Sequence, residues 1–330
     1  MLVLTQEDIK KAITMREAID AVETAFAQHY LQRAAIPLRT RIHCTKSDGD
    51  VLFMPAYMQD LDGVGIKIVS VFPRNAASNK PTISAIMLLN DVTTGEPLAL
   101  MDATYLTALR TGAASGAATR HLANQDAARA AIFGTGAQAL RQLEAILEVR
   151  NLVEVMVFDI DPGRVGSFID TCAKELSRFT FSLKQAADPD EAVRAADIIV
   201  TATTSRKPVF HGHDIKNGVH INGIGSYTPE MQELDALTVS RADKLVVDAY
   251  DASLKEAGDL IIPLEKGLIT TSDIYCEIGK ITSGQAPGRE NKEEITLFKS
   301  VGIAAQDIAV AKIIYDHALA KGLGQQINLS

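Results

Sequence analysis

The feature that most restricts how this chain can fold is a glycine-rich turn, AIFGTGAQA, at residues 131–139. Gly134, Gly136 and Ala139 form the pattern G-x-G-x-x-A between an apolar strand-like segment and an alanine-rich helical segment. The first glycine permits a tight turn, the second lets the backbone approach a pyrophosphate, and the small third residue lets the helix pack closely on the strand. Free N–H groups at the start of such a helix attract phosphates. The turn therefore predicts a dinucleotide-binding unit.

The segments that follow this turn alternate regularly between helical and strand-like patterns. The strand-like stretches EVMVFDI, FSLK and DIIVTAT are separated by helical segments, and the apolar runs VHINGIG and KLVVDAY continue the series. Such alternation is typical of βαβ units and of a parallel sheet. We therefore expect an α/β fold with a doubly wound parallel sheet.

An acidic residue at the end of the second strand supports the choice of ligand. Asp159 lies 23 residues after Gly136, where a carboxylate accepts hydrogen bonds from the adenosine ribose and repels the additional phosphate of NADP. The sequence therefore predicts NAD(H), with NADP(H) as the alternative. A second interpretation is that the turn belongs to another kind of α/β protein and that Asp159 caps the helix beginning near Pro162.

Further candidate cofactor residues follow the fourth strand of the series, at the edge where parallel sheets bind ligands. An equally simple interpretation is that the hydroxyls of Thr201 and Thr203 cap a turn. Together with the glycine turn and the acidic position, the candidate cofactor-binding residues are Gly134, Thr135, Gly136, Ala137, Gln138, Asp159, Ile160, Thr201, Ala202 and Thr203.

The N-terminal third of the chain has a different pattern. Residues 1–30 read as helix, with capping-box spacings at Thr5 and Thr14, and residues 37–101 read as short strands joined by turns, which predicts an antiparallel or mixed sheet. An amphipathic helix expected at residues 304–321 would pack back on that sheet. We therefore expect a discontinuous domain of residues 1–115 plus 305–330, interrupted by a dinucleotide-binding domain of residues 116–304.

Composition restricts the class of partner. The 330 residues carry a net charge of −8, which argues against nucleic-acid or anionic-membrane surfaces and favours a small-molecule substrate. The three cysteines show no CxxC spacing, so neither a metal site nor a disulfide framework is predicted. The N-terminus lacks the apolar core of a signal peptide and no apolar run of about 18 residues occurs, so we expect a cytoplasmic protein.

The residues that could carry chemistry are cationic, because no GxSxG, HExxH or P-loop pattern is present. Arg39, Arg41, Lys67 and Arg110 lie in or next to the N-terminal sheet. Lys67 interrupts the apolar strand VGIKIVSVF, and a buried lysine must be paired or must shift its pKa toward neutrality; the alternative is an edge-strand lysine that reaches water. Arg110 lies among small residues and could bind a carboxylate, or form an internal ion pair.

The seven histidines offer no metal-like spacing. His211 and His213 flank a glycine in a polar loop, and no histidine has a partner at helical spacing. We therefore expect surface or loop roles for these two residues and for His220.

Several longer stretches resemble one known family. They are GIKIVSVFP, PTISAIMLLND, TGEPLALMDATYLTALRTGAASG, FGTGAQA, TSRKPVF, VHINGIGS, MQELD and EITLFKSVGIAAQDIAVAKIIYDHAL, in that order along nearly the whole chain. In these stretches the sequence resembles the ornithine cyclodeaminase and mu-crystallin family of nicotinamide-dependent enzymes. The resemblance implies a Rossmann domain inserted in a discontinuous domain that binds substrate and forms a homodimer through its sheet.

The resemblance also implies roles for individual residues. A basic residue at Arg41, the strand lysine Lys67 and Arg110 would hold the substrate carboxylate, and Lys67 would also be placed for proton transfer. Positions beside the cofactor are matched by Thr82, Thr111 and Asp307.

Two substitutions separate this chain from the diamine-binding members it resembles. Leu52 and Tyr227 stand where ornithine cyclodeaminases carry a glutamate and an aspartate, and neither side chain offers the negative charge that a second ammonium group requires. We therefore predict a nicotinamide-dependent reductase of a small cyclic 2-imino acid, of the pyrroline-2-carboxylate or piperideine-2-carboxylate type. The alternatives are an ornithine cyclodeaminase, an open-chain amino-acid dehydrogenase such as alanine dehydrogenase, and a crystallin-like binding protein without catalysis.

Overall fold

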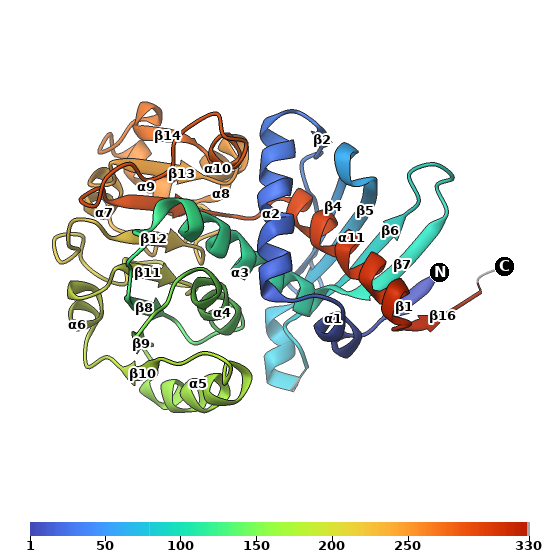
Figure 1. Cartoon of the computed structure of the whole chain (residues 1–330), viewed down its shortest axis with the longest axis horizontal. Helices are drawn as coiled ribbons and strands as arrows, with labels where there is room; N and C mark the ends of the chain where they lie inside the picture. Colours follow the sequence, from blue (N-terminus) through green and yellow to red (C-terminus); the bar gives the residue numbers. More distant parts are fainter. Residues whose placement is uncertain (79, 329–330) are drawn as a thin grey trace. The chain divides into compact units, whose positions relative to one another are not determined.

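The computed structural model describes residues 1–78 and 80–328, and the chain folds into two compact units (Figure 1). Unit 1 contains Met1–Arg110 and the C-terminal segment that starts at Ile303, and unit 2 contains Thr111–Gly302. Unit 1 thus ends at Arg110 rather than at the expected residue 115, and resumes at Ile303 rather than at residue 305. The first crossing lies inside helix α3 (Ala103–Leu122).

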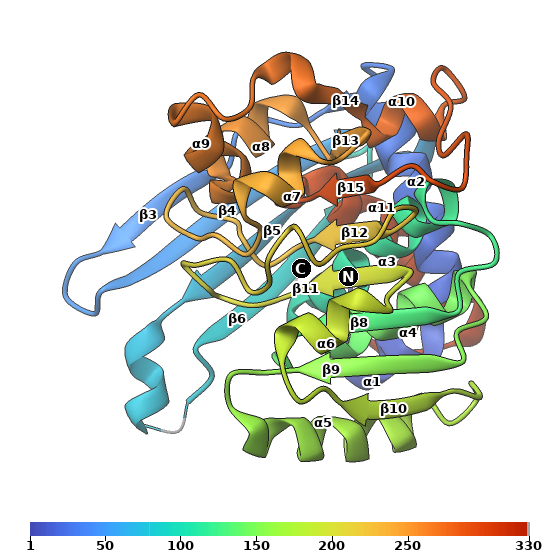
Figure 2. The same cartoon turned by 90° about the vertical axis from the view of Figure 1, so that its left-hand side faces the viewer.

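Unit 2 is built on a parallel sheet. Within residues 111–302, all of which the structure describes, eight strands pair in the order β10-β9-β8-β11-β12-β15-β13-β14, and every pairing is parallel (Figure 2). The strands are β8 (Arg129–Phe133), β9 (Glu154–Phe158), β10 (Ser182–Gln185), β11 (Ile198–Thr201), β12 (His220–Gly223), β13 (Lys244–Val247), β14 (Ile274–Glu277) and β15 (Thr296–Lys299). The order reverses between β8 and β11, and ligands of such sheets bind beyond the strand ends at this reversal.

Helices cover both faces of this sheet. Along β8, Ala130 and Ile132 belong to one hydrophobic core, whereas Ala131 and Phe133 belong to another. This alternation follows from the two-residue period of a strand. The helices are α4 (Ala139–Val149), α5 (Pro162–Glu175), α6 (Pro189–Arg194), α7 (Ala236–Ser240), α8 (Tyr250–Glu256), α9 (Gly258–Glu265) and α10 (Ile278–Thr282). The predicted α/β fold with a doubly wound parallel sheet is confirmed.

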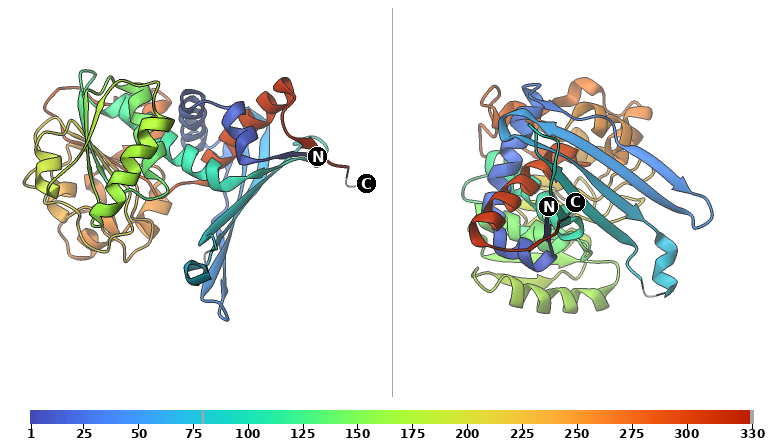
Figure 3. Two further views of the ribbon diagram at one scale, coloured as in Figure 1. Left: turned by 90° about the horizontal axis from the view of Figure 1, so that it is seen from below. Right: turned by 90° about the vertical axis from the view of Figure 1, so that its right-hand side faces the viewer.

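Unit 1 contains a mixed sheet in which β3 to β7 pair antiparallel and β1 pairs parallel with β7. Its strands are β1 (Leu2–Leu4), β2 (Ala34–Ala35), β3 (Thr40–Cys44), β4 (Gly49–Met58), β5 (Gly63–Val71), β6 (Ile83–Asn90), β7 (Pro97–Asp102) and β16 (Gln325–Gln326). The helices α1 (Gln6–Ala12), α2 (Met15–Tyr30) and α11 (Ala304–Lys321) lie on one side of this sheet (Figure 3). Helix α11 therefore returns the end of the chain to the N-terminal sheet.

The two faces of the unit 1 sheet differ in what covers them. On one face Met54, Lys67 and Met87 stand side by side in the cross-strand register, and all three are buried. On the other face Phe53, Ile68 and Ile86 are aligned, and Ile86 is 45% exposed. The helices of this unit thus cover the lysine face and leave an apolar face accessible.

The N-terminal region departs from the expected helix at its start. Leu2–Leu4 form strand β1, which pairs with β7 and with β16 from the other end of the chain. Three apolar residues carry too little local signal to distinguish the two states, and here pairing with distant strands decides the outcome. Both expected capping boxes, at Thr5 and Thr14, are present.

Among the described residues, no helix combines the length and the apolar character that a membrane crossing requires.

Candidate active site

Lys67 lies in the middle of β5 on the helix-covered face, and it is 1% exposed. Its Nζ lies 2.8 Å from the carboxylate of Asp307, to which it donates a hydrogen bond. The alternative of an edge-strand lysine reaching water is therefore wrong, because β4 and β6 flank β5 and α11 supplies a buried partner.

The same carboxylate binds a second cation. Arg110, near the middle of α3, donates from Nε to Asp307 at 3.1 Å and from Nη1 to Gln306 at 2.7 Å. One carboxylate thus lies between two buried cations, and the three groups carry a net positive charge while Lys67 is protonated. A cluster of this kind suits an anionic ligand such as a carboxylate.

Asp307 was expected beside the cofactor, and the structure places it within unit 1 between Lys67 and Arg110. Gln306 was not recognised from the sequence as part of this cluster. Its position offered a signal, because Gln306 is the third residue of α11 and accepts from the backbone N–H of Ile303, as a capping glutamine does.

The environment of Lys67 makes it easy to deprotonate. Burial is the largest influence and lowers the pKa, Asp307 opposes this effect, and Arg110 and Arg39 lower the pKa further, to about 8. A group that titrates near neutral pH can both give and take a proton at physiological pH. Lys67 is therefore suited to proton transfer.

Arg41 shares the face of Lys67 but lies at its edge. Arg41 pairs with Leu52 across the β3–β4 ladder, and its side chain is 64% exposed and bonded through Nε and Nη2 to Asp50 at 2.8 and 2.7 Å. The neighbouring Arg39 is partly buried and acts electrostatically on Lys67. The family resemblance pointed to Arg41, whereas Arg39 lies just before β3 begins at Thr40.

The other residues predicted to contact the substrate or the cofactor differ in how far they are buried. Leu52 is half-buried on β4, Thr82 is exposed just before β6, and Thr111 is buried in α3 next to Arg110. Tyr227 follows β12 in unit 2 and is 48% exposed.

The glycine turn after β8 has the geometry that a pyrophosphate site needs. Gly134 has a φ of +92°, and a Cβ there would lie 2.8 Å from the carbonyl oxygen of Ala202, so the ends of β8 and β11 pack directly together. A Cβ at Gly136 would meet no atom within 4 Å, which leaves its backbone open to a ligand. Gln138 precedes α4 without a side-chain cap. The N–H of Ala139 donates to the carbonyl oxygen of Gly136 and that of Thr135 donates to Asp159, so phosphate oxygens would be received by the other N–H groups of this turn.

Asp159 lies where the ribose-binding acid belongs. Its carboxylate accepts from the backbone N–H and the hydroxyl of Thr135, at 2.8 and 2.7 Å, and from the N–H of Asp161. Burial alone would raise the pKa of Asp159, but these hydrogen bonds lower it below its usual value. The next residue, Ile160, is 94% exposed. The residues therefore fit the adenosine end of a dinucleotide.

The alternative role for Asp159, as a helix cap, is wrong. Helix α5 is capped by Asp161, whose side chain accepts from the N–H of Gly163.

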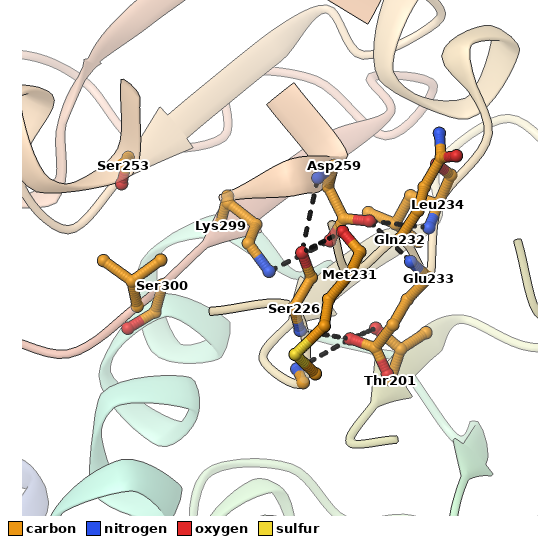
Figure 4. Close-up of polar contacts among 12 residues, drawn as sticks. Thr201, Ser226, Met231, Gln232, Glu233, Leu234, Ser253, Asp259, Lys299 and Ser300 are labelled. Atoms are coloured by element: carbon orange, nitrogen blue, oxygen red, sulfur yellow. Dashed lines mark hydrogen bonds and ion pairs between the residues drawn. The ribbon is translucent and has the colours of Figure 1, made fainter. Parts of the chain in front are cut away.

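The threonines after β11 bind a buried acid that sequence reasoning missed. Thr201 and Thr203 donate hydrogen bonds to Glu233, which is fully buried. Figure 4 shows Thr201 beside Glu233. The available signal was the stretch MQELD, which contains Glu233 and is one of the stretches that carry the family resemblance. Ala202 contributes its carbonyl oxygen to the contact with the glycine turn.

Other reactive side chains contribute no chemistry here. Burial is the main cause that raises the pKa of the Cys172 and Cys276 thiols, to about 12 and about 11, so both stay protonated. The expected surface or loop role of His220 is wrong: it is fully buried in β12, bonded to Thr296 and Asn222, and burial lowers its pKa to about 3.

One group in the described part of the chain has ligand atoms close enough for a metal, namely Asp190, His211 and Asp214. The guanidinium of Arg194 lies 3.8 and 3.7 Å from the two carboxylates. The single positive charge of Arg194 therefore offsets part of the charge of the two carboxylates.

The chain is similar to known proteins over nearly its whole length. The model of the ornithine cyclodeaminase/mu-crystallin family matches residues 1–322. A Delta(1)-pyrroline-2-carboxylate reductase of Bacillus cereus is 40% identical over 327 residues, covering 99% of each chain. The solved Delta(1)-pyrroline-2-carboxylate reductase of Thermococcus litoralis, in complex with NADH and L-proline, is 43% identical with a TM-score of 0.93, covering 99% of this chain and 100% of that one. An archaeal alanine dehydrogenase dimer with bound NAD is 39% identical with a TM-score of 0.90, covering 100% and 99%. The chain belongs to the ornithine cyclodeaminase/mu-crystallin family.

Proposed function

We propose that this protein is an NADH-dependent reductase of a small cyclic 2-imino acid, of the pyrroline-2-carboxylate or piperideine-2-carboxylate type, and that its product is the cyclic amino acid. The observation that carries the proposal is the buried cluster of Lys67, Arg110 and Asp307 in a chain that also has an NAD-type glycine turn. The reductases that resemble the chain over 99% of its length support the choice of substrate class.

Each group has a distinct role in the proposed reaction. NADH, when bound, supplies the hydride that adds to the imine carbon. Arg110 holds the substrate carboxylate through its guanidinium, with its orientation maintained by Asp307 and Gln306. Lys67 donates the proton that the imine nitrogen needs, and Asp307 keeps its ammonium oriented. Catalysis here is mainly orientation and placement of charge.

The setting of Leu52 and Tyr227 disfavours diamine substrates. Leu52 presents an apolar side chain on the face of Lys67, and Tyr227 presents a phenol after β12. We propose that Leu52 favours an uncharged ring over a diamine beside Lys67 and that Tyr227, which offers no negative charge, disfavours a second ammonium group. We also propose that Arg41, exposed at the edge of the unit 1 sheet, takes part in binding the substrate carboxylate. Thr82 and Thr111 complete the set of residues proposed to approach the cofactor and substrate.

A second candidate function is open-chain amino-acid dehydrogenation, which the 39% identity to the archaeal alanine dehydrogenase favours. The deciding experiment follows NADH oxidation by absorbance with pyrroline-2-carboxylate, and in parallel with pyruvate plus ammonia. A third assay mixture contains L-ornithine plus NAD. NADH consumption with the imine alone supports the reductase. Turnover only with pyruvate plus ammonia would show an open-chain amino-acid dehydrogenase instead of the reductase. Proline formed only from ornithine would show an ornithine cyclodeaminase instead.

The pKa of Lys67 predicts how the rate of imine reduction and the rate of the reverse oxidation of the amino acid each depend on pH. Burial lowers this pKa to about 8, and the protonated form is the donor in reduction. Reductive kcat/KM is expected to fall about tenfold per pH unit above pH 8, whereas oxidation of the amino acid, which needs the neutral amine, rises up to about pH 8 and then levels. Steady-state rates between roughly pH 6 and pH 10 test this. Identical profiles for the two directions would contradict the role of Lys67.

Asp159 is expected to set the preference for NADH. Replacing it by Ser removes a charged acceptor for the ribose hydroxyls and the repulsion of a 2′-phosphate, so kcat/KM with NADH should fall about 10- to 100-fold, while kcat/KM with NADPH should rise. The matched control is Asp161→Ala, which removes the α5 cap at a stability cost of about 1 kcal/mol. An unchanged NADH to NADPH ratio in Asp159→Ser would contradict this assignment.

We propose that the chain forms a homodimer through the accessible apolar face of the unit 1 sheet. Phe53, Ile68 and Ile86 align on this face, and exposed contiguous apolar surface is typical of subunit interfaces. The dimeric alanine dehydrogenase relative supports the proposal. Light scattering is expected to give twice the 35.5 kDa of one chain, and Ile86→Lys is expected to give a monomer. A dimer that persists in Ile86→Lys would place the interface elsewhere.

A further inference from the structure

Glu233 is a fully buried carboxylate that accepts hydrogen bonds from two separate loops (Figure 4). From Thr201, the last residue of β11, it receives the hydroxyl at 2.9 Å, and from the loop after β11 it receives both the N–H and the hydroxyl of Thr203, at 2.6 and 2.8 Å. From the loop after β12 it receives the N–H groups of Gly225 and Ser226, at 2.6 and 3.1 Å. One side chain thus fixes the ends of two neighbouring strands relative to each other.

A second buried pair holds Glu233 itself. Asp259, in α9, accepts from the backbone N–H groups of Glu233 and Leu234, at 2.6 and 2.9 Å, and Lys299 of β15 donates to Asp259 at 3.0 Å. Burial and Asp259 raise the pKa of Glu233, and Lys299 and the donors from Thr203 oppose them. The ammonium of Lys299 is therefore bonded to one buried acid, Asp259, and acts electrostatically on the second, Glu233.

The two loops lie where the second half of a dinucleotide would bind. Asp159 marks the adenosine half, at the end of β9 on one side of the reversal in strand order. A dinucleotide lies across such a reversal, so its other half belongs at the ends of β11 and β12. The loops touch closely there, since a Cβ at Gly225 would lie 2.1 Å from the carbonyl oxygen of Thr203. Tyr227, which we propose disfavours a diamine substrate, follows Ser226 within the second loop.

We propose that Glu233 is a positioning residue, which holds the loops after β11 and β12 in the arrangement that receives the nicotinamide half of NADH and the imino acid. This inference rests on the proposed function for the identity of the substrate. A carboxylate is required because all five groups that approach it are donors, and the NH₂ group of a glutamine would be directed against some of them.

The test compares two ligands with Glu233→Gln. ADP-ribose contains the adenosine half and the pyrophosphate but no nicotinamide. We expect the Kd of NADH, measured by fluorescence, to rise about tenfold, and the Kd of ADP-ribose, measured by calorimetry, to stay within about twofold. We also expect kcat with pyrroline-2-carboxylate to fall about 10²-fold, because displaced reacting groups lose the required alignment.

Two further variants keep the test decisive. Asp197→Asn removes a carboxylate that accepts from Ala128 and Arg129 at the opposite, amino end of β8 and β11, so it should lower thermal stability and leave both Kd values unchanged. Ser226→Ala removes the hydroxyl that bonds to Met231 and Asp259. Ser226→Ala should raise the Kd of NADH, as Glu233→Gln does. It therefore takes the place of Glu233→Gln in the test if that variant does not fold.

Two outcomes would overturn the inference. One is a Glu233→Gln protein with reduced thermal stability but with Kd for NADH within twofold of the wild type, because the role would then be purely structural. The other is an equal loss of affinity for NADH and ADP-ribose, which would mean that the whole domain is disturbed. If the wild type does not turn over pyrroline-2-carboxylate, the proposed substrate fails, and the comparison of the two Kd values still decides the role of Glu233.

Discussion

Replacing Lys67 by Met is expected to lower kcat for imine reduction by about 10²- to 10⁴-fold while the Kd of NADH stays within about twofold of the wild type. The range is that of a positioned proton donor in an active site. The ammonium of Lys67 is the donor in the proposed reaction, and a thioether carries no proton to give. The glycine turn and Asp159 in unit 2 are untouched by the change, so the adenosine end of the cofactor keeps its contacts.

The structure indicates that Lys67→Met will fold. Lys67 lies between Met54 and Met87 in the cross-strand register, on a face already built from buried methionines. Asp307 keeps the guanidinium of Arg110 as a charged partner. The matched control is Met54→Leu, which alters packing directly opposite Lys67 and retains the cation; such swaps usually cost less than about 1.5 kcal/mol. Stopped-flow and steady-state NADH oxidation measure the effect, and near-wild-type turnover by Lys67→Met would refute the assigned role.

Replacing Lys299 by Met is expected to lower the free energy of unfolding by about 3–5 kcal/mol, the usual cost of breaking a buried ion pair by removing one partner. Lys299 and Asp259 are both fully buried, and their atoms lie 3.0 Å apart. Without the ammonium, Asp259 and the nearby Glu233 remain as buried acids that no cation balances. For a domain of this size the loss corresponds to a fall in Tm of roughly 6–20 °C.

Lys244→Met is the matched control for this prediction. Lys244 is also a buried lysine on a parallel strand of the same sheet, but its nearer partner, Glu290 at 2.6 Å, has a side chain that is 58% exposed, and its second partner, Glu294, is 3.8 Å away. Removing Lys244 leaves Glu290 in contact with water, so the expected loss of stability is smaller. Calorimetric unfolding of both variants checks the difference. Equal destabilisation by the two substitutions would show that burial of the partner acid is not the deciding factor.

The fold of unit 2 was largely predictable because its signals are local. The glycine turn, the strand before it and the helix after it are contiguous, and Asp159 follows within one further βαβ step. Each of these elements carries its own periodicity, so no distant contact is needed to recognise them. His220 was misjudged in the same unit, because its burial depends on the neighbouring strand β15, whose Thr296 pairs with it and bonds to its ring.

The cluster in unit 1 was only half predictable. Lys67 attracted notice because a lysine interrupts an apolar strand, but its partner Asp307 is 240 positions away in the sequence. The electrostatic influence of Arg39 on Lys67 was likewise not predictable, because it depends on how the segment before β3 packs. Strand pairing with Leu52 and the ion pair with Asp50 place Arg41 at the edge.

The sequence by itself determined the elements, the dinucleotide-binding turn and the cationic residues, since each of these depends on neighbours along the chain. The tertiary structure decided which charges meet. It brought Asp307 between Lys67 and Arg110, and it buried Glu233 under two loops from different strands. The physical reason is that the energy of a charge depends on burial and on partners within a few ångströms, and these come from residues that the sequence separates.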